Sequence, residues 1–149
     1  MLKYLYINDH ILKITVAIWF HLYYINNMIV EFESRFAKSK QDLICKLIAF
    51  GQSELFPHED DIFINISAIR KQGVCGDCMY EDDNEFSIRL DKSLTPDNLI
   101  TTVLHELVHV SQYLRGMVMI NNLPYDERPH EIEAHSKEKQ LTEAFNGQA

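Results

Sequence analysis

The residues best suited to chemistry lie in one pentapeptide, His105-Glu106-Leu107-Val108-His109, which has the pattern H-E-x-x-H. Histidines four positions apart lie one turn apart on the same face of a helix, so both imidazoles can bind one zinc ion. The glutamate between them can then act as a general base toward water. A shuffled chain of this composition would contain the pattern about 3% of the time, so the surrounding sequence must decide.

The surrounding sequence indicates a two-sided helix that begins after the N-cap Thr95 and stops at Gly116. On a helical wheel, His109 lies about 40° and Gln112 about 20° from His105, on opposite sides of it. The apolar residues fall between about 120° and 220° on the same wheel. They are Leu99, Ile100, Val103, Leu107, Val110 and Leu114. The helix is therefore predicted to bury one side in the core and to present both histidines on the other.

A catalytic zinc ion needs a third protein ligand, and the next predicted helix, Pro129–Phe145, contains several candidates. Helical geometry favours Glu131, which borders the predicted buried face of this helix, over Glu133, which points away. His130 and His135 are the remaining alternatives. The third ligand is thus expected on the last helix, with Glu131 preferred.

Two stretches of the chain resemble a known group of enzymes. H-E-x-x-H followed by a helix with E-x-x-A-x, here Glu131–His135, is similar to the gluzincin zinc metallopeptidases. More narrowly, HELVHVSQYLRG and RPHEIEAH resemble small metallopeptidases of tailed phages and bacteria, over roughly residues 60 to 140. The resemblance implies that Glu131 is the third zinc ligand and that His135 orients a zinc-bound histidine by hydrogen bonding.

The activity implied by the resemblance is hydrolysis of peptide bonds in a peptide or protein, with Glu106 as the general base. The oxyanion that forms on the attacked carbonyl needs a hydrogen-bond donor, for which Tyr125, Tyr113 and Arg115 are the candidates. The predicted strand Glu85–Asp91 resembles the edge strand that holds an extended substrate in such peptidases.

Two other functions are compatible with these residues. A SprT-like protease of DNA-associated proteins would use a histidine as its third ligand and would need a basic surface. The chain has a formal net charge of -8, so we expect no nucleic-acid partner. A non-catalytic, metal-stabilised accessory or interaction protein of a phage would have no need of Glu106.

The fold expected around these residues is a single α+β domain. A small, mainly antiparallel sheet is predicted to pack against the H-E-x-x-H helix and the C-terminal ligand-bearing helix. Apolar residues at three- and four-residue spacing predict an additional N-terminal helix over Glu31–Phe50, ended by Gly51. Alternating apolar residues predict strands over Ile62–Ile69 and Glu85–Asp91, with turns between them.

The beginning of the chain is apolar and is predicted to lie outside this domain. Residues 1–27 are interpreted as an N-terminal extension and residues 28–149 as the domain. The apolar run Ile14–Ile25 is shorter than the roughly 20 residues of a membrane-spanning helix, so no stable membrane insertion is expected. A hairpin or a buried element that turns at Asn8-Asp9 is the favoured interpretation of this segment, and a targeting or membrane-associating segment is the alternative.

Cysteine usage indicates a reducing compartment. Three cysteines do not make a disulfide framework, so the cytoplasm is expected, or the host cytoplasm for a phage-encoded protein. Cys75 and Cys78 form a C-x-x-C pattern, but no second pair completes a zinc site. We interpret them as free thiols in a turn between strands.

Overall fold

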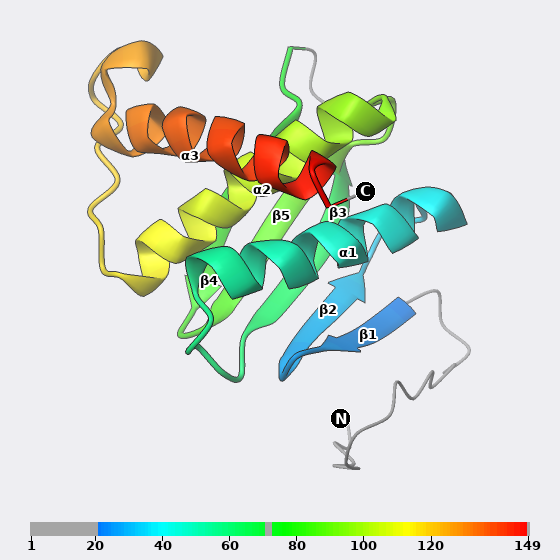
Figure 1. The fold of residues 1–149 in the computed structure, drawn as a ribbon. Coiled ribbons are helices and arrows are strands. Elements are labelled where there is room, and N and C mark those ends of the chain that lie inside the picture. Colours follow the sequence, from blue (N-terminus) through cyan, green and yellow to red (C-terminus); the bar gives the residue numbers. More distant parts are fainter. Residues whose placement is uncertain (1–20, 71–72, 149) are drawn as a thin grey trace.

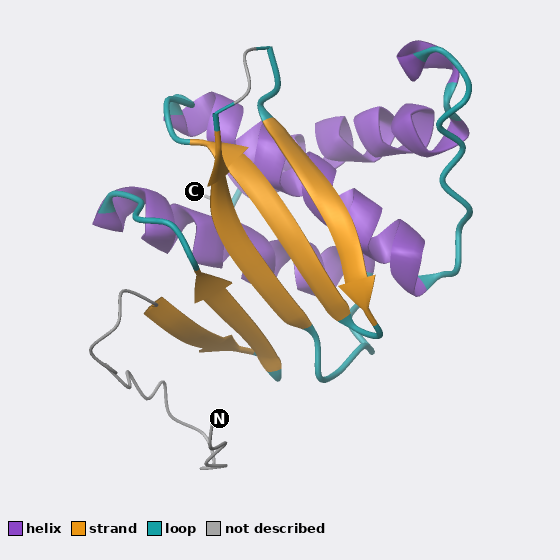
Figure 2. Ribbon diagram, turned by 180° about the vertical axis from the view of Figure 1, so that it is seen from behind, coloured by secondary structure: helices purple, strands orange, loops and turns teal. Residues whose placement is uncertain are grey.

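Five strands form one sheet, and three helices lie on one side of it, as Figures 1 and 2 show from opposite directions. The computed structural model describes residues 21–70 and 73–148. The strands are β1 (His21–Ile25), β2 (Met28–Phe32), β3 (Phe63–Ile69), β4 (Gly76–Asp82) and β5 (Glu85–Asp91). The helices are α1 (Lys38–Leu55), α2 (Pro96–Leu114) and α3 (Pro129–Asn146), with a short 3-10 helix, η1, at Tyr125–Glu127. The predicted α+β class is confirmed.

The strand order in the sheet is β1-β2-β3-β5-β4. The pairings at both edges, β1 with β2 and β4 with β5, are antiparallel. The two central pairings, β2 with β3 and β3 with β5, are parallel. The sheet is therefore mixed, and it departs in part from the mainly antiparallel sheet that we predicted. The parallel pair β2–β3 arises because the chain crosses over through α1 between these strands.

The first hairpin, formed by β1 and β2, begins before residue 28, where the domain was predicted to start. β1 and β2 are joined by Asn26 and Asn27, whose φ angles of 45° and 65° are those of a two-residue type I′ turn. Residues 21–27 therefore belong to the sheet and not to an N-terminal extension. The hairpin predicted at Asn8-Asp9 lies outside the described residues.

The first helix lies further along the chain than the predicted range Glu31–Phe50. Phe32 fits the helical spacing, but it lies in β2 and alternates with other buried strand residues. Gly51 does not end α1. A Cβ atom at this glycine would lie 2.5 Å from Cδ1 of Leu107 in α2, so the glycine allows the two helices to approach closely.

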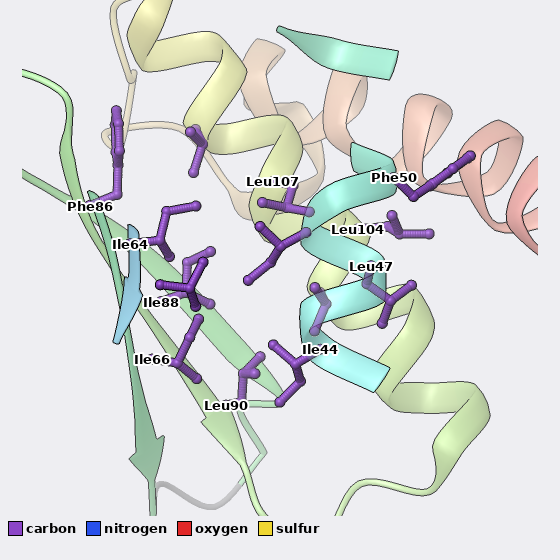
Figure 3. Close-up of a cluster of buried hydrophobic side chains, with 14 of the residues drawn as sticks. Ile44, Leu47, Phe50, Ile64, Ile66, Phe86, Ile88, Leu90, Leu104 and Leu107 are labelled. Atoms are coloured by element: carbon purple, nitrogen blue, oxygen red, sulfur yellow. The ribbon is translucent and has the colours of Figure 1, made fainter. Parts of the chain in front are cut away.

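The core lies between the sheet and helices α1 and α2, as Figure 3 shows. Apolar side chains of the central strands face those of the two helices, and each is at most 1% exposed. The strand residues are Ile64, Ile66, Phe86, Ile88 and Leu90, and the helix residues are Ile44, Leu47, Leu104 and Leu107. The expected alternation of burial holds along β5, and in β3 it holds as far as Ile66, after which Ile69 is buried in place of Ala68. None of the described helices is long and apolar enough to cross a membrane.

The segment between the two predicted strands is itself a strand. β4 forms one edge of the sheet, so β5, which we predicted as the edge strand, lies in its interior. Cys78, which we placed in a turn, lies in β4 and faces α2, while Cys75 precedes the strand and is exposed. The sequence of β4 was misread because no residue in it is fully buried and because its acidic residues are typical of turns.

Candidate metal centre

Helix α2 carries the H-E-x-x-H pattern and has the ends that the sequence predicts. At its start, Oγ1 of Thr95 accepts a hydrogen bond from the backbone N of Asn98 at 3.3 Å. At its end, Gly116 has a φ of 71°, and the backbone N of Met117 donates to the carbonyl of Gln112 at 2.9 Å. This is a Schellman ending, which requires a residue with positive φ.

The face of α2 that carries the H-E-x-x-H residues is polar and yet buried. His105, Glu106, His109 and Gln112 are 7%, 4%, 8% and 0% exposed. Buried polar groups are stable only where other groups satisfy them. The partners of this face come from α3, which packs across α2.

Helix α3 brings Glu131 to the two histidines. Its Oε2 atom lies 3.2 Å from Nε2 of His105 and 3.4 Å from Nε2 of His109. The two Nε2 atoms are 3.1 Å apart. Among the predicted ligands, the structure thus gathers His105, His109 and Glu131 into one group that could hold a metal ion.

Glu133, a predicted alternative ligand, has a different set of partners. Its Oε1 lies 2.8 Å from both Nη2 of Arg115 and Nζ of Lys137, and its Oε2 accepts from Nε2 of Gln112. Burial would raise the pKa of Glu133, but hydrogen bonds from Lys137 and Gln112 lower it to about 2. This carboxylate is therefore neutralised by two cationic side chains.

The two histidines of α3 lie beside the group without joining it. His130 is 4% exposed, and its Nε2 is 3.5 Å from Oε1 of Glu131. Its Nδ1 has no hydrogen-bond partner within the described part of the chain. His135 lies at the surface, where its Nε2 is 3.2 Å from the hydroxyl of Tyr125.

The second ring nitrogen of each α2 histidine is also engaged. Nδ1 of His105 lies 2.9 Å from Oε2 of Glu138, and Nδ1 of His109 lies 2.7 Å from Oε1 of Gln112. A carboxylate and an amide oxygen can only accept, so each Nδ1 must donate. In a neutral imidazole the proton is then on Nδ1, and Nε2 presents a lone pair.

Glu138 takes the position that we predicted for His135. The histidine contacts the same carboxylate, with its Nδ1 3.4 Å from Oε2 of Glu138, but the bond to His105 comes from Glu138. The nitrogens of His105 and His135 and the carboxylate of Glu138 form a second group of potential ligands. The hydrogen bond at 2.9 Å, however, already occupies Nδ1 of His105. Glu138 lies two turns beyond Glu131 on one face of α3, and this spacing could have identified it.

The three converging atoms, Nε2 of His105, Nε2 of His109 and Oε2 of Glu131, could bind a cation. Two imidazole lone pairs and a carboxylate oxygen repel one another at these distances unless a positive charge lies among them. A proton on His105 can supply that charge at low pH. Burial alone would lower the pKa of His105, but the hydrogen bond to Glu138 and the nearby carboxylates raise it. Two histidines and one glutamate are also the ligand set of a catalytic zinc ion.

Glu106 lies beside this group, beneath the edge strand. A Cβ atom at Gly76 of β4 would lie 3.3 Å from Oε1 of Glu106 and 2.7 Å from Cγ2 of Thr102. Only a glycine therefore lets β4 come this close to α2. Burial raises the pKa of Glu106 to about 8, so the carboxyl group can hold a proton near neutral pH.

Of the three candidate oxyanion donors, Tyr125 is nearest the ligand group. Burial would raise the pKa of Glu131, but the nearby His109 and a hydrogen bond from the hydroxyl of Tyr125 lower it. Tyr113 instead stacks on Tyr80 of β4, with ring centroids 5.6 Å apart. Arg115 is held by its ion pair with Glu133.

A comparison with protein-family models finds no match for this chain, and a comparison with curated protein sequences finds none either. Function must therefore be inferred from the geometry and chemistry of the site itself.

Proposed function

We propose that this protein is a small zinc-dependent peptidase. The observation that carries the proposal is the convergence of three atoms, Nε2 of His105, Nε2 of His109 and Oε2 of Glu131, within 3.4 Å of one another. The Nδ1 atom of each histidine donates to an acceptor, Glu138 for His105 and Gln112 for His109, as is usual for metal-binding histidines. A buried carboxyl group, that of Glu106, lies next to them.

The residues divide into ligands and a base. A zinc ion bound by His105, His109 and Glu131 supplies Lewis acidity, which polarises the scissile carbonyl and makes water more acidic. Glu106 accepts the proton of the attacking water on its carboxylate and passes it to the leaving amine. Burial raises the pKa of Glu106, which makes its carboxylate a stronger base than an exposed one.

The substrate is proposed to be an extended peptide segment bound along β4. The outer edge of this strand has no partner strand within the described residues, so its backbone groups are available for pairing. Gly76 brings the strand into contact with Glu106, which sets the bound peptide beside the proposed base. The hydroxyl of Tyr125 is the proposed donor to the oxyanion.

The composition of the chain supports a reducing compartment and argues against a nucleic-acid partner. The net charge of -8 argues against a nucleic-acid partner, and three free cysteines suit the cytoplasm. The second candidate function is a non-catalytic, metal-stabilised protein. A closed structural site has no need for a buried carboxyl group such as that of Glu106 beside its ligands, and this favours the peptidase.

The test is metal content together with peptide hydrolysis. The wild-type protein, purified without chelator, is expected to contain one zinc per chain by elemental analysis. Glu106→Gln should keep the zinc and lose hydrolysis of an unfolded protein substrate about 100-fold or more. Glu131→Ala should lose or weaken the zinc, while Glu143→Ala, an exposed change on the same helix, should not.

The outcomes separate the two functions. Zinc retained in Glu106→Gln with no hydrolysis by the wild type supports the metal-stabilised protein. A metal-free wild type that takes up no added zinc would overturn both. Equal zinc content in Glu131→Ala and the wild type would remove Glu131 from the ligand set.

A further inference from the structure

Gln112 is the most deeply buried polar residue next to the ligand group. It lies one turn beyond His109 on α2 and is 0% exposed. Its Oε1 faces Nδ1 of His109 at 2.7 Å. Its Nε2 donates to the carbonyl of His130 at 2.8 Å and to Oε2 of Glu133 at 3.0 Å. One amide thus contacts three residues on two helices.

These contacts allow only one orientation of the amide. Both hydrogens of its NH₂ group are used, one by a backbone carbonyl and one by a carboxylate. Rotation by 180° would place Oε1 against the carbonyl of His130 and the carboxylate of Glu133, which are both acceptors. Arg115 and Lys137 hold Glu133 in its ionised form, so this acceptor does not become a donor.

The fixed amide has two consequences for the site. First, His109 can face Oε1 of Gln112 only with a proton on Nδ1, and its Nε2 is then a lone pair. Second, the bond to the carbonyl of His130 ties α2 to the first turn of α3, one residue before Glu131. The same side chain therefore sets the tautomer of one ligand and the position of another.

We infer that Gln112 is the positioning residue of the site: it selects the Nδ1–H tautomer of His109 and holds the first turn of α3 in place. The metal-binding consequence rests on the proposed zinc site, whereas the tautomer is a property of the protein without metal. Sequence analysis put Gln112 on the same helical face as the histidines and assigned it no role.

The direct test is the tautomer of His109 in metal-free protein, read from imidazole ¹⁵N chemical shifts above the usual histidine pKa of about 6.5. The wild type should show a protonated Nδ1 and an unprotonated Nε2. Gln112→Leu, which has a similar volume and no polar atoms, should populate both tautomers. Gln140→Leu, an exposed change on α3, should leave the spectrum of His109 unchanged.

Gln112→Glu separates the two roles of the amide, which are to accept from Nδ1 of His109 and to donate to α3. It is also the variant to use if Gln112→Leu does not fold. Its carboxylate can still accept from Nδ1, so the tautomer should be kept, but it cannot donate to α3. Both variants should bind zinc about 10- to 100-fold more weakly than the wild type, as expected when the residue behind a metal ligand is lost.

A wild-type Nδ1–H signal that persists in Gln112→Leu would overturn the inference, as would a mixed tautomer in Gln112→Glu. A wild type that binds no zinc but shows the expected change of tautomer would overturn the peptidase and leave the positioning role supported. A purely structural role for Gln112 would lower the stability of the variants without changing the tautomer of His109.

Discussion

The apolar face and the polar face of α2 are both buried, but they are stabilised by different interactions. Leu104 and Leu107 on one face are 0% exposed, and His105 and His109 on the other are 7% and 8% exposed. The leucines pack among apolar side chains of the sheet and of α1. The histidines instead depend on hydrogen bonds from Nδ1, His105 to Glu138 and His109 to Gln112.

The difference lies in how each face tolerates change. An apolar contact is non-directional, and its loss costs free energy in proportion to the surface and cavity involved. A buried imidazole needs partners at defined positions, and a lost partner leaves a donor or acceptor unsatisfied. Changes to the apolar face should therefore alter stability, and changes to the polar face should alter metal binding.

The largest expected loss of stability comes from the apolar face. Leu107 lies between His105 and His109 in sequence but points to the opposite side, against Gly51 of α1. Leu107→Ala should lower the free energy of unfolding by about 2–5 kcal/mol, because it leaves a cavity in the core. Urea denaturation of metal-free protein measures this. Zinc content per folded chain should equal that of the wild type, and a variant that is stable but free of zinc would contradict the separation of the two faces.

Gly76→Ala tests the contact of the edge strand with the polar face. The added methyl group would meet Cγ2 of Thr102 at 2.7 Å, so β4 must shift away from α2 and Glu106. Overpacking of this kind costs about 1–3 kcal/mol in stability. Peptide hydrolysis should fall more than zinc content does. Thr102→Ser removes Cγ2, and in the Gly76→Ala background it should restore part of both losses; no restoration would mean that the steric contact is not the cause.

The sequence allowed both ends of α2, most of α3 and two strands to be predicted, because these elements have local signals. Thr95 caps α2, Gly116 ends it, and buried residues alternate along β5 and along β3 as far as Ile66. The α1 prediction was wrong at both ends. The spacing of Phe32 continues a helical period by coincidence, and Gly51 serves packing against α2, which no local pattern reveals.

The ligands of the site were easier to predict than the residues that support them. His105 and His109 are related by a spacing of one helical turn. Glu138 and Gln112 acquire their roles only when α3 packs across α2. Glu138 lies 33 residues from His105, and Gln112 is oriented by His130 and Glu133, which lie 18 and 21 residues away. β4 escaped prediction for a similar reason, since an edge strand with one half-covered face has weak alternation.

Glu138→Gln tests whether the negative charge beside His105, on the polar face, strengthens zinc binding. The amide can still accept from Nδ1 of His105, but it carries no charge to polarise the ring. Zinc affinity should fall about 10- to 100-fold, or roughly 1.4–2.7 kcal/mol. Competition with a chelating dye of known affinity measures this. Glu143→Gln is the matched control, since it removes one exposed negative charge from the same helix. Equal affinities for the two variants would mean that long-range charge, and not the charge next to His105, determines binding.

The smallest expected effect lies at the start of α2, where neither face is involved. Thr95→Ala removes the acceptor for the backbone N of Asn98 and should cost about 1 kcal/mol in the free energy of unfolding. Thr95→Asp keeps an acceptor there and should restore the loss, because aspartate is an equally good N-cap. Zinc affinity should stay within twofold of the wild type in both variants, since nine residues of helix lie between the cap and His105 and the core holds the turns between them. If Thr95→Ala weakened zinc binding as much as Glu138→Gln does, the position of the histidines would depend on the whole of α2 and not on their partners in α3.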